Sequence, residues 1–189
     1  MDVEGRETAL PSDYDRDSDS FTAYTPSATT NSAAIPHHPA ISEPQMSSIP
    51  TPGLSFHIKC IETGKVITIQ KGEVVLALES EQSTRWECVE NHGFLGFRDP
   101  SSYNFLGYNN HEELCCKVRH HMLWERFHVK ETKRGSYHIS MTHYDNWIGL
   151  MLGGELRPLG RFEKDGLEKI KLTADRGSAI NWRFINVPA

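Results

Sequence analysis

Hydrophobic and polar positions alternate with a period of two along most of the chain after about residue 54. Short runs of this kind are typical of half-buried strands, and Gly, Asn, Asp or Ser residues separate one run from the next. No long window shows the 3.6-residue period and the capping residues of an amphipathic helix. The pattern therefore predicts an all-β protein. The expected strands are 56–61, 65–70, 74–79, 86–90, 93–98, 104–109, 113–118, 124–130, 136–142, 147–151, 155–159 and 181–187.

These twelve short strands fall into three repeats of four. The segment Asn104-Phe105-Leu106-Gly107-Tyr108 recurs as Asn146-Trp147-Ile148-Gly149-Leu150, and Gly64-Lys65-Val66-Ile67-Thr68 is a looser copy. Successive copies lie about 40 residues apart, a period typical of repeat architectures. One repeat exposes an apolar face that it cannot cover, whereas three repeats around an axis close that face inward. The sequence therefore predicts a single β-trefoil.

A tryptophan begins the last expected strand of each repeat: Trp86, Trp124 and Trp182. If the three repeats are equivalent, the three indoles occupy equivalent positions. Each would bury roughly 150–250 Å² in the core. We therefore expect all three tryptophans to be core residues.

The third repeat is longer than the others, and its excess falls near residues 160–177. This charged stretch predicts an inserted loop or hairpin. Residues 1–53 contain most of the ten prolines and most of the acidic excess behind the net charge of −5. Such a segment buries too little apolar area to offset an ordering entropy of about 1–2 kcal/mol per residue. We expect a disordered acidic tail over 1–53 and one β-trefoil domain over 54–189.

Cysteine usage and the first residues bear on the compartment. The four cysteines include no Cys-x-x-Cys spacing, and the neighbours Cys115 and Cys116 would point to opposite faces of a strand. Free thiols of this kind are typical of a reducing compartment. Residues 1–20 are acidic and polar, unlike a signal or transit peptide, and no run approaches the roughly 18 apolar residues of a membrane helix. We expect a cytoplasmic or nuclear protein without membrane insertion.

Catalytic and metal-binding patterns are weak. There is no Gly-x-Ser-x-Gly motif, and no cysteine lies in a recognisable catalytic neighbourhood. The ten histidines show no spacing that would bring three or four zinc ligands together. Glu112 and Glu113 are adjacent and do not supply two carboxyls facing each other across a cleft. The sequence predicts neither an enzyme, a catalytic residue, a metal site nor a cofactor.

Basic residues gather between about residues 117 and 134. On a strand, Arg126, His128 and Lys130 share one face, and Phe127 and Val129 face the core. The candidate binding surface comprises Lys117, Arg119, His120, His121, Arg126, His128 and Lys130. It suits an acidic partner such as actin, an anionic lipid or RNA, and ordinary solvated surface is the alternative. Because the domain is nearly neutral and aromatic residues do not interleave, nucleic acid is not indicated.

Residues 86–90 with 93–98, 105–108 and 117–127 resemble passages of the fascin-like, or actin-crosslinking-like, β-trefoils. Single-domain fungal proteins of that kind are the most similar in character. The resemblance covers about residues 56–187 and implies a β-trefoil with actin or another protein as partner. Fascins cross-link filaments with several trefoils, whereas this chain has room for one, so bundling would require a dimer.

We therefore expect a non-catalytic interaction module, with a protein partner as the main expectation and actin named through resemblance. Carbohydrate binding is the alternative because many trefoils are lectins. Ricin-type lectins carry Gln-x-Trp in each repeat, but the residues two positions before the tryptophans are Thr84, Met122 and Ile180. The alternative is therefore a carbohydrate-binding trefoil of a non-ricin type.

Overall fold

The computed structural model describes residues 47–132, 135–144 and 153–188, all within one compact unit that spans residues 42–189. In these ranges the chain forms twelve strands and two single turns of 3-10 helix. The strands are β1 (Ser55–Cys60), β2 (Val66–Gln70), β3 (Glu73–Ala77), β4 (Trp86–Asn91), β5 (Phe94–Arg98), β6 (Phe105–Tyr108), β7 (Leu114–Val118), β8 (Phe127–Glu131), β9 (Tyr137–His143), β10 (Glu155–Lys164), β11 (Leu167–Leu172) and β12 (Asn181–Val187). The 3-10 turns are η1 (Leu123–Glu125) and η2 (Arg176–Ser178). None of the helical structure in the described ranges has the length and hydropathy needed to cross a membrane.

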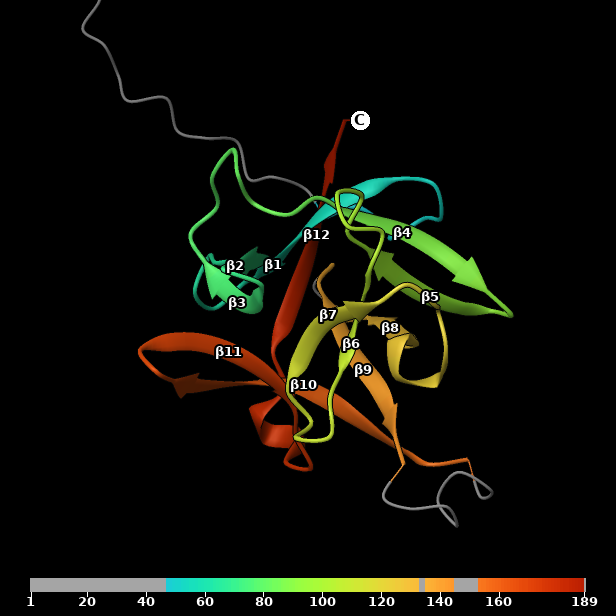
Figure 1. The fold of residues 1–189 in the computed structure, drawn as a ribbon. Helices are drawn as coiled ribbons and strands as arrows, with labels where there is room; N and C mark the ends of the chain where they lie inside the picture. The colour runs from blue at the N-terminus through green and yellow to red at the C-terminus, as the bar shows by residue number, and fades with distance from the viewer. Residues whose placement is uncertain (1–46, 133–134, 145–152, 189) are drawn as a thin grey trace, which may run out of the picture. The chain divides into compact units, whose positions relative to one another are not determined.

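Six of these strands close a barrel. Antiparallel pairing runs from β1 to β4, β5, β8, β9 and β12, and then back to β1. The other six described strands form the hairpins β2–β3, β6–β7 and β10–β11. Each hairpin also pairs with the barrel strand that precedes it, and Figure 1 shows the hairpins in three colours because they come from separate thirds of the chain. The predicted all-β trefoil of twelve strands in three sets of four is confirmed.

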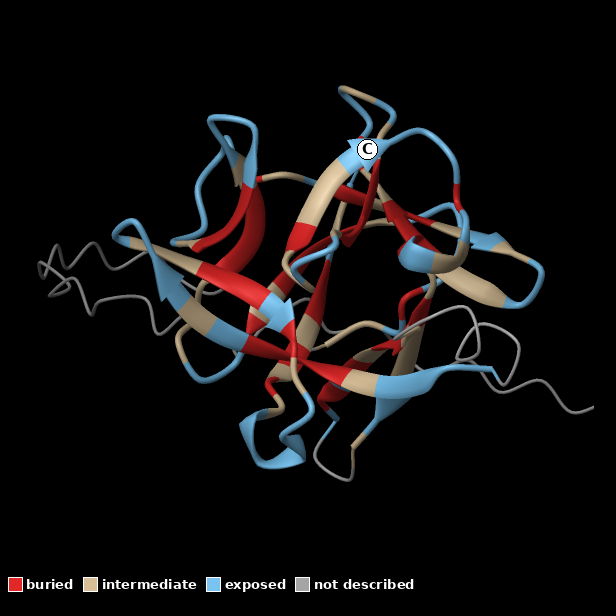
Figure 2. Ribbon diagram, turned by 60° about the horizontal axis from the view of Figure 1, so that its bottom comes forward, coloured by how far each residue is buried: buried red, intermediate tan, exposed pale blue. Residues whose placement is uncertain are grey.

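The core is built from equivalent residues of the three repeats. Ile67, Leu106 and Leu159, one from the first strand of each hairpin, are completely buried. Trp86 and Trp182, which begin β4 and β12, are also completely buried, as predicted. The Trp86 indole N–H donates a hydrogen bond to the Ile67 carbonyl at 2.8 Å. Figure 2 shows the buried residues along the middles of the strands and the exposed ones at loops and hairpin tips.

The prediction of a third core tryptophan is wrong. Trp124 lies in η1, before β8, and its side chain is 42% exposed. Strand β8 begins instead at Phe127, which is 3% exposed and pairs with Leu95 of β5. The pairing of Trp86 with Phe56 of β1 is equivalent. Phe127 therefore takes the core position that a tryptophan takes in the first repeat.

The third repeat differs from the expected assignment as well. The expected strand 147–151 lies outside the described residues, and the third hairpin is formed by β10 and β11. The segment Pro158-Leu159-Gly160 thus corresponds to Phe105-Leu106-Gly107 of the second repeat. Strand β11, which was not predicted, lies in the charged stretch expected as an insertion near residues 160–177. Extra length in this repeat goes into a long hairpin arm and η2.

Residues 47–53, the end of the predicted tail, lie against the barrel. The Ser48 backbone N–H donates to the Phe184 carbonyl at 2.7 Å, and the Gly53 N–H donates to the Cys88 carbonyl at 2.8 Å. The Ser47 hydroxyl also accepts from the Phe184 N–H at 3.2 Å. The remainder of the predicted tail lies outside the described residues, and its boundary at residue 53 stays a prediction.

Candidate functional site

The connection from β7 to β8, residues 119–126, presents large apolar side chains to solvent. Trp124 is 42% exposed, Met122 63% and Val118, at the end of β7, 44%. Such side chains are expected in a core, and their clustering at the surface is typical of a binding site. The loop is therefore the first place to look for a ligand.

Trp124 stands between two adjoining pockets. The first, which we call the apolar pocket, has a volume of about 350 Å³ and is lined by Val118, His120, Met122, Leu123, Trp124 and Glu125. The second, the polar pocket, has a volume of about 280 Å³. It is lined by Phe105, Gly107, Tyr108, Asn109, Asn110, His111, Cys115, Lys117, Val118, Trp124 and Glu125. Val118, Trp124 and Glu125 line both pockets, so the two adjoin, and we call the pair the groove. Its size suits a small ligand.

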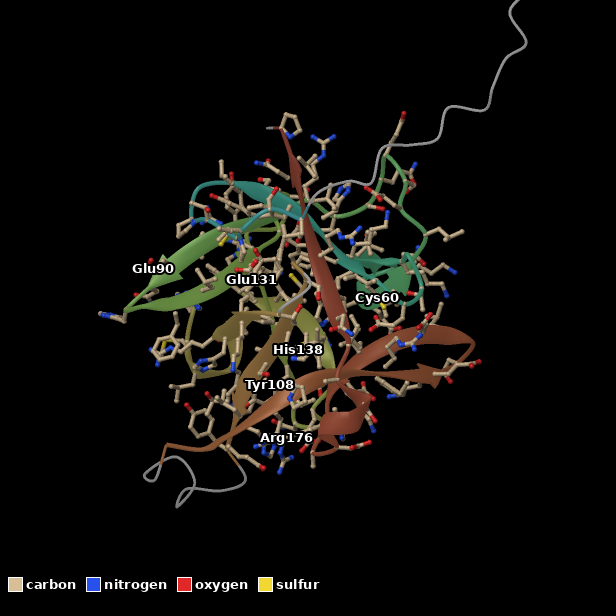
Figure 3. All side chains as sticks on the ribbon, turned by 180° about the vertical axis from the view of Figure 1, so that it is seen from behind. Cys60, Glu90, Tyr108, Glu131, His138 and Arg176 are labelled. Atoms are coloured by element: carbon tan, nitrogen blue, oxygen red, sulfur yellow. The ribbon has the colours of Figure 1, made fainter. Side chains whose placement is uncertain are left out.

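Stacking on Tyr108 fixes the Trp124 indole. The two rings are nearly parallel, with centroids 5.4 Å apart and an interplanar angle of 23°. The Tyr108 hydroxyl donates to the Thr142 carbonyl of β9 at 2.9 Å, and Figure 3 shows Tyr108 beside this strand. Burial raises the pKa of Tyr108 to about 12, so the phenol keeps its proton at physiological pH. The indole thus rests on a ring that is itself anchored to the barrel.

Two glycines allow the loop to lie close to the sheet. A Cβ atom at Gly107 of β6 would come within 2.7 Å of the Trp124 carbonyl oxygen and 3.0 Å of the Glu125 side chain. A Cβ atom at Gly96 of β5 would lie 2.9 Å from the His121 ring. With contacts this short, a side chain at either position would force the neighbouring atoms to shift. The absence of side chains here sets the height of the exposed indole above the barrel.

Glu125 places a carboxylate at the floor of the groove. The residue is 6% exposed, and its Oε2 accepts a hydrogen bond from the Met122 N–H at 3.0 Å. Burial raises the pKa of this carboxyl above its ordinary value. A partly desolvated carboxylate is a strong acceptor for ligand hydroxyl groups, because charge-assisted hydrogen bonds strengthen where water is excluded.

The polar pocket adds donors from the β6–β7 turn. Asn109 orders this turn, since its Oδ1 accepts from the backbone N–H groups of His111 at 2.8 Å and Glu113 at 3.1 Å. The side chains of Asn110, His111 and Lys117 make no hydrogen bond or ion pair with any described residue. They offer an amide, an imidazole and an ammonium group to a ligand.

His121 does not belong to the surface patch predicted for it. The residue is 8% exposed, and its ring stacks on Phe105 with centroids 5.3 Å apart and an angle of 13°. Burial and then the neighbouring charge of Arg126 lower the pKa of His121. The imidazole therefore supports the loop from beneath as a neutral aromatic ring.

The remaining residues of the predicted basic surface are divided. Lys117 lines the polar pocket and His120 lines the apolar one, whereas Arg119 and Lys130 are exposed residues outside both linings. The role of this surface in binding an acidic partner stays a prediction.

Arg126, which connects η1 to β8, and His128 of β8 are both half-buried. The guanidinium of Arg126 lies 4.6 Å from the centroid of the Phe94 ring, and the ring of His128 meets Phe94 edge to face at 5.4 Å. Both are therefore engaged with an aromatic ring of the protein itself. In the part of the chain that the structure describes, no group of three or more His, Cys, Asp or Glu residues is arranged to hold a metal ion.

Sequence comparison gives no relatives: no family model matches the chain, and no curated protein matches it. Solved structures do match. A ricin B-like lectin of Macrolepiota procera, in complex with lactose, has 13% identity and a TM-score of 0.51 over 72% of this chain and 98% of the lectin. The BEL β-trefoil has 14% identity and a TM-score of 0.53 over 74% of this chain and 97% of the other.

An exo-β-1,3-galactanase from Clostridium thermocellum also matches, with 16% identity and a TM-score of 0.57 over 74% of this chain. The chain spans only 31% of the length of that enzyme, so the likeness is to one part of it. At such identities the comparisons establish the fold. The protein is a β-trefoil.

Proposed function

We propose that the protein binds carbohydrate in the groove around Trp124. The observation that carries the proposal is an indole that is 42% exposed, backed by Tyr108 and flanked by two pockets. The C–H face of a pyranose ring is apolar and weakly positive, so it packs well against the negative face of an aromatic ring. Asn110 and Lys117 then donate to sugar hydroxyls, and the Glu125 carboxylate accepts from them.

The structural neighbours support a sugar ligand. The Macrolepiota procera lectin is described in complex with lactose, and the Clostridium thermocellum protein is an exo-β-1,3-galactanase. This chain lacks Gln-x-Trp, so its mode of binding differs from that motif and relies on the β7–β8 loop. These points favour carbohydrate over the protein partner that the sequence first suggests.

The proposed role is binding without catalysis. Glycoside hydrolysis generally uses two carboxyl groups on opposite sides of the scissile bond. Among the described residues that line the two pockets, Glu125 is the only acid. A single carboxylate suits recognition of hydroxyl groups, so we expect bound glycans to be released unchanged.

A glycan array probed with the full chain tests the proposal. We expect at least one glycan class to bind and the Trp124→Ala variant to lose that signal by tenfold or more, while Trp124→Phe keeps part of it. Tyr103→Ala is a matched control, because Tyr103 is 58% exposed and lies outside the linings of both pockets. An array without signal, or equal binding by wild type and Trp124→Ala, would contradict the proposal.

A protein partner is the second candidate. The exposed Met122 and Val118 would serve a protein interface as well as a ligand pocket. Actin is suggested by the resemblance to fascin-like trefoils. If actin is the partner, a cytoplasmic location is expected. Co-sedimentation with actin filaments separates the two functions, since carbohydrate binding at the groove predicts no pelleting of the chain.

A further inference from the structure

The two halves of the groove differ in the number of polar side chains that they offer. The apolar pocket is lined by Val118, Met122, Leu123 and Trp124, with His120 and Glu125 as its polar residues. The surface of the polar pocket is also mainly apolar, but this pocket carries Asn109, Asn110 and His111 from the β6–β7 turn and Lys117 from β7. A free sugar therefore finds more hydrogen-bond partners in the second half. In the first half most of its hydroxyl groups would give up water without gaining a partner, which is unfavourable.

We propose that the ligand is a glycoside with an apolar aglycone, with its sugar ring in the polar pocket and its alkyl or aryl group in the apolar pocket. This inference rests on the proposed carbohydrate function and specifies its ligand class. The two pockets share Val118, Trp124 and Glu125 in their linings, so they adjoin closely enough for one molecule to reach from one to the other.

The positions of the shared residues support a single bipartite ligand. Trp124 borders both halves, so its indole contacts the sugar ring and the first atoms of the aglycone. Glu125 also borders both, and its carboxylate lies near the junction, where hydroxyl groups of the sugar remain within reach. Met122, by contrast, borders only the apolar half and is 63% exposed. An aglycone would cover this side chain, and a monosaccharide alone would leave it in water.

Isothermal titration calorimetry with the full chain tests the inference. The probes are methyl and hexyl β-glycosides of galactose, glucose, mannose and N-acetylglucosamine, together with hexanol. A buried methylene strengthens binding about fourfold, so burial of even two or three methylenes makes the hexyl glycoside more than tenfold tighter than its methyl counterpart. Hexanol alone should bind far more weakly than either.

Met122→Gln is the diagnostic variant because the side chain is exposed and lines only the apolar half. It should reduce the advantage in affinity of the hexyl over the methyl glycoside to about threefold or less. Leu78→Gln is the matched control, since Leu78 is 74% exposed and lines neither pocket.

Three outcomes would overturn the inference, and they are distinguishable. Equal affinity for methyl and hexyl glycosides refutes the aglycone subsite and leaves the carbohydrate function standing. Hexanol binding as tightly as the hexyl glycosides shows that the apolar pocket takes a partner without a sugar. Binding of none of the glycosides refutes the carbohydrate function and this inference together.

Discussion

Alanine substitutions at Trp86 and at Trp124, made in separate variants, distinguish a core tryptophan from a surface tryptophan by the stability that each variant loses. Trp86 is completely buried, and its indole N–H is bonded to the Ile67 carbonyl. Truncation of a buried tryptophan costs about 3–5 kcal/mol, and a buried carbonyl left without its donor adds about 1–3 kcal/mol. We expect Trp86→Ala to lower the free energy of unfolding by about 4–8 kcal/mol.

The expected loss for Trp124→Ala is much smaller. With 42% of the side chain exposed, roughly 90–150 Å² of a tryptophan's usual 150–250 Å² is buried. At about 25 cal/mol per Å² this area amounts to roughly 2–4 kcal/mol as an upper bound. Alanine retains part of that burial and the unfolded chain already hides part of it. No closed cavity forms at the surface, so we expect a loss of about 1–2 kcal/mol.

Urea unfolding followed by far-UV circular dichroism measures both losses by linear extrapolation. If Trp86→Ala does not fold, the pair Trp86→Phe and Trp124→Phe preserves the comparison, with the larger loss again at Trp86. Equal losses at the two positions, or a loss above about 3 kcal/mol at Trp124, would refute the placement of Trp124 at the surface.

Three further changes probe the support of the groove. Gly107→Ala places a Cβ atom 2.7 Å from the Trp124 carbonyl oxygen. It should cost about 1–3 kcal/mol of stability in urea unfolding and weaken glycan binding, and an unchanged stability would contradict the close contact. Burial raises the folded-state pKa of Glu125, so the native protein holds this proton more tightly than the unfolded chain and wild-type stability falls as the pH rises above 4.5. The Glu125→Gln variant has no carboxyl group to ionise, so its Tm should rise relative to that of wild type as the pH increases. A Tm difference that stays constant with pH would contradict the raised pKa of Glu125. Burial and Arg126 lower the folded-state pKa of His121, so stability is lost as the pH falls below 6.5. His121→Gln should show a shallower acid loss in thermal melts, and an equally steep profile would exclude His121 as its source.

Local pattern was sufficient to predict the architecture. Period-two alternation and turn residues are properties of short segments, and threefold repetition follows from comparing those segments. Trp86 and Trp182 were predicted as core because each begins the last strand of a repeat, and both are completely buried. Closure of three repeats around an axis then leaves no other place for their indoles.

The misplacement of Trp124 came from treating the three tryptophans as equivalent, although their spacings of 38 and 58 residues differ. The expected strand began at Trp124, whereas Trp124 lies in η1 and β8 begins only at Phe127. The alternation of the strand therefore does not extend to the indole. Phe127, the first residue of β8, is buried and takes the core position instead.

The groove itself required the structure. Asn110 lies in the β6–β7 turn and Trp124 in the β7–β8 loop, and both line the same pocket. The β6–β7 pairing that positions the turn has a register shift between Phe105 and Leu106. A shift of this kind has no fixed sequence signature. The third hairpin was misassigned for a related reason. The first strand of the third hairpin was expected at residues 147–151. The pairing of β10 with β9 and β11 instead gives this place to the segment that contains Pro158-Leu159-Gly160.

The most direct test of the account follows the indole N–H resonances of the chain's four tryptophans by ¹H–¹⁵N NMR during titration with the best glycan from the array. The resonances are assigned with single Trp→Phe variants. The account predicts a saturable shift of the Trp124 resonance with the affinity found by calorimetry, while the resonances of the buried Trp86 and Trp182 stay in place. A glycan that binds without moving the Trp124 resonance, or that moves those of Trp86 and Trp182 instead, would contradict the claim that this exposed indole forms the sugar-binding surface.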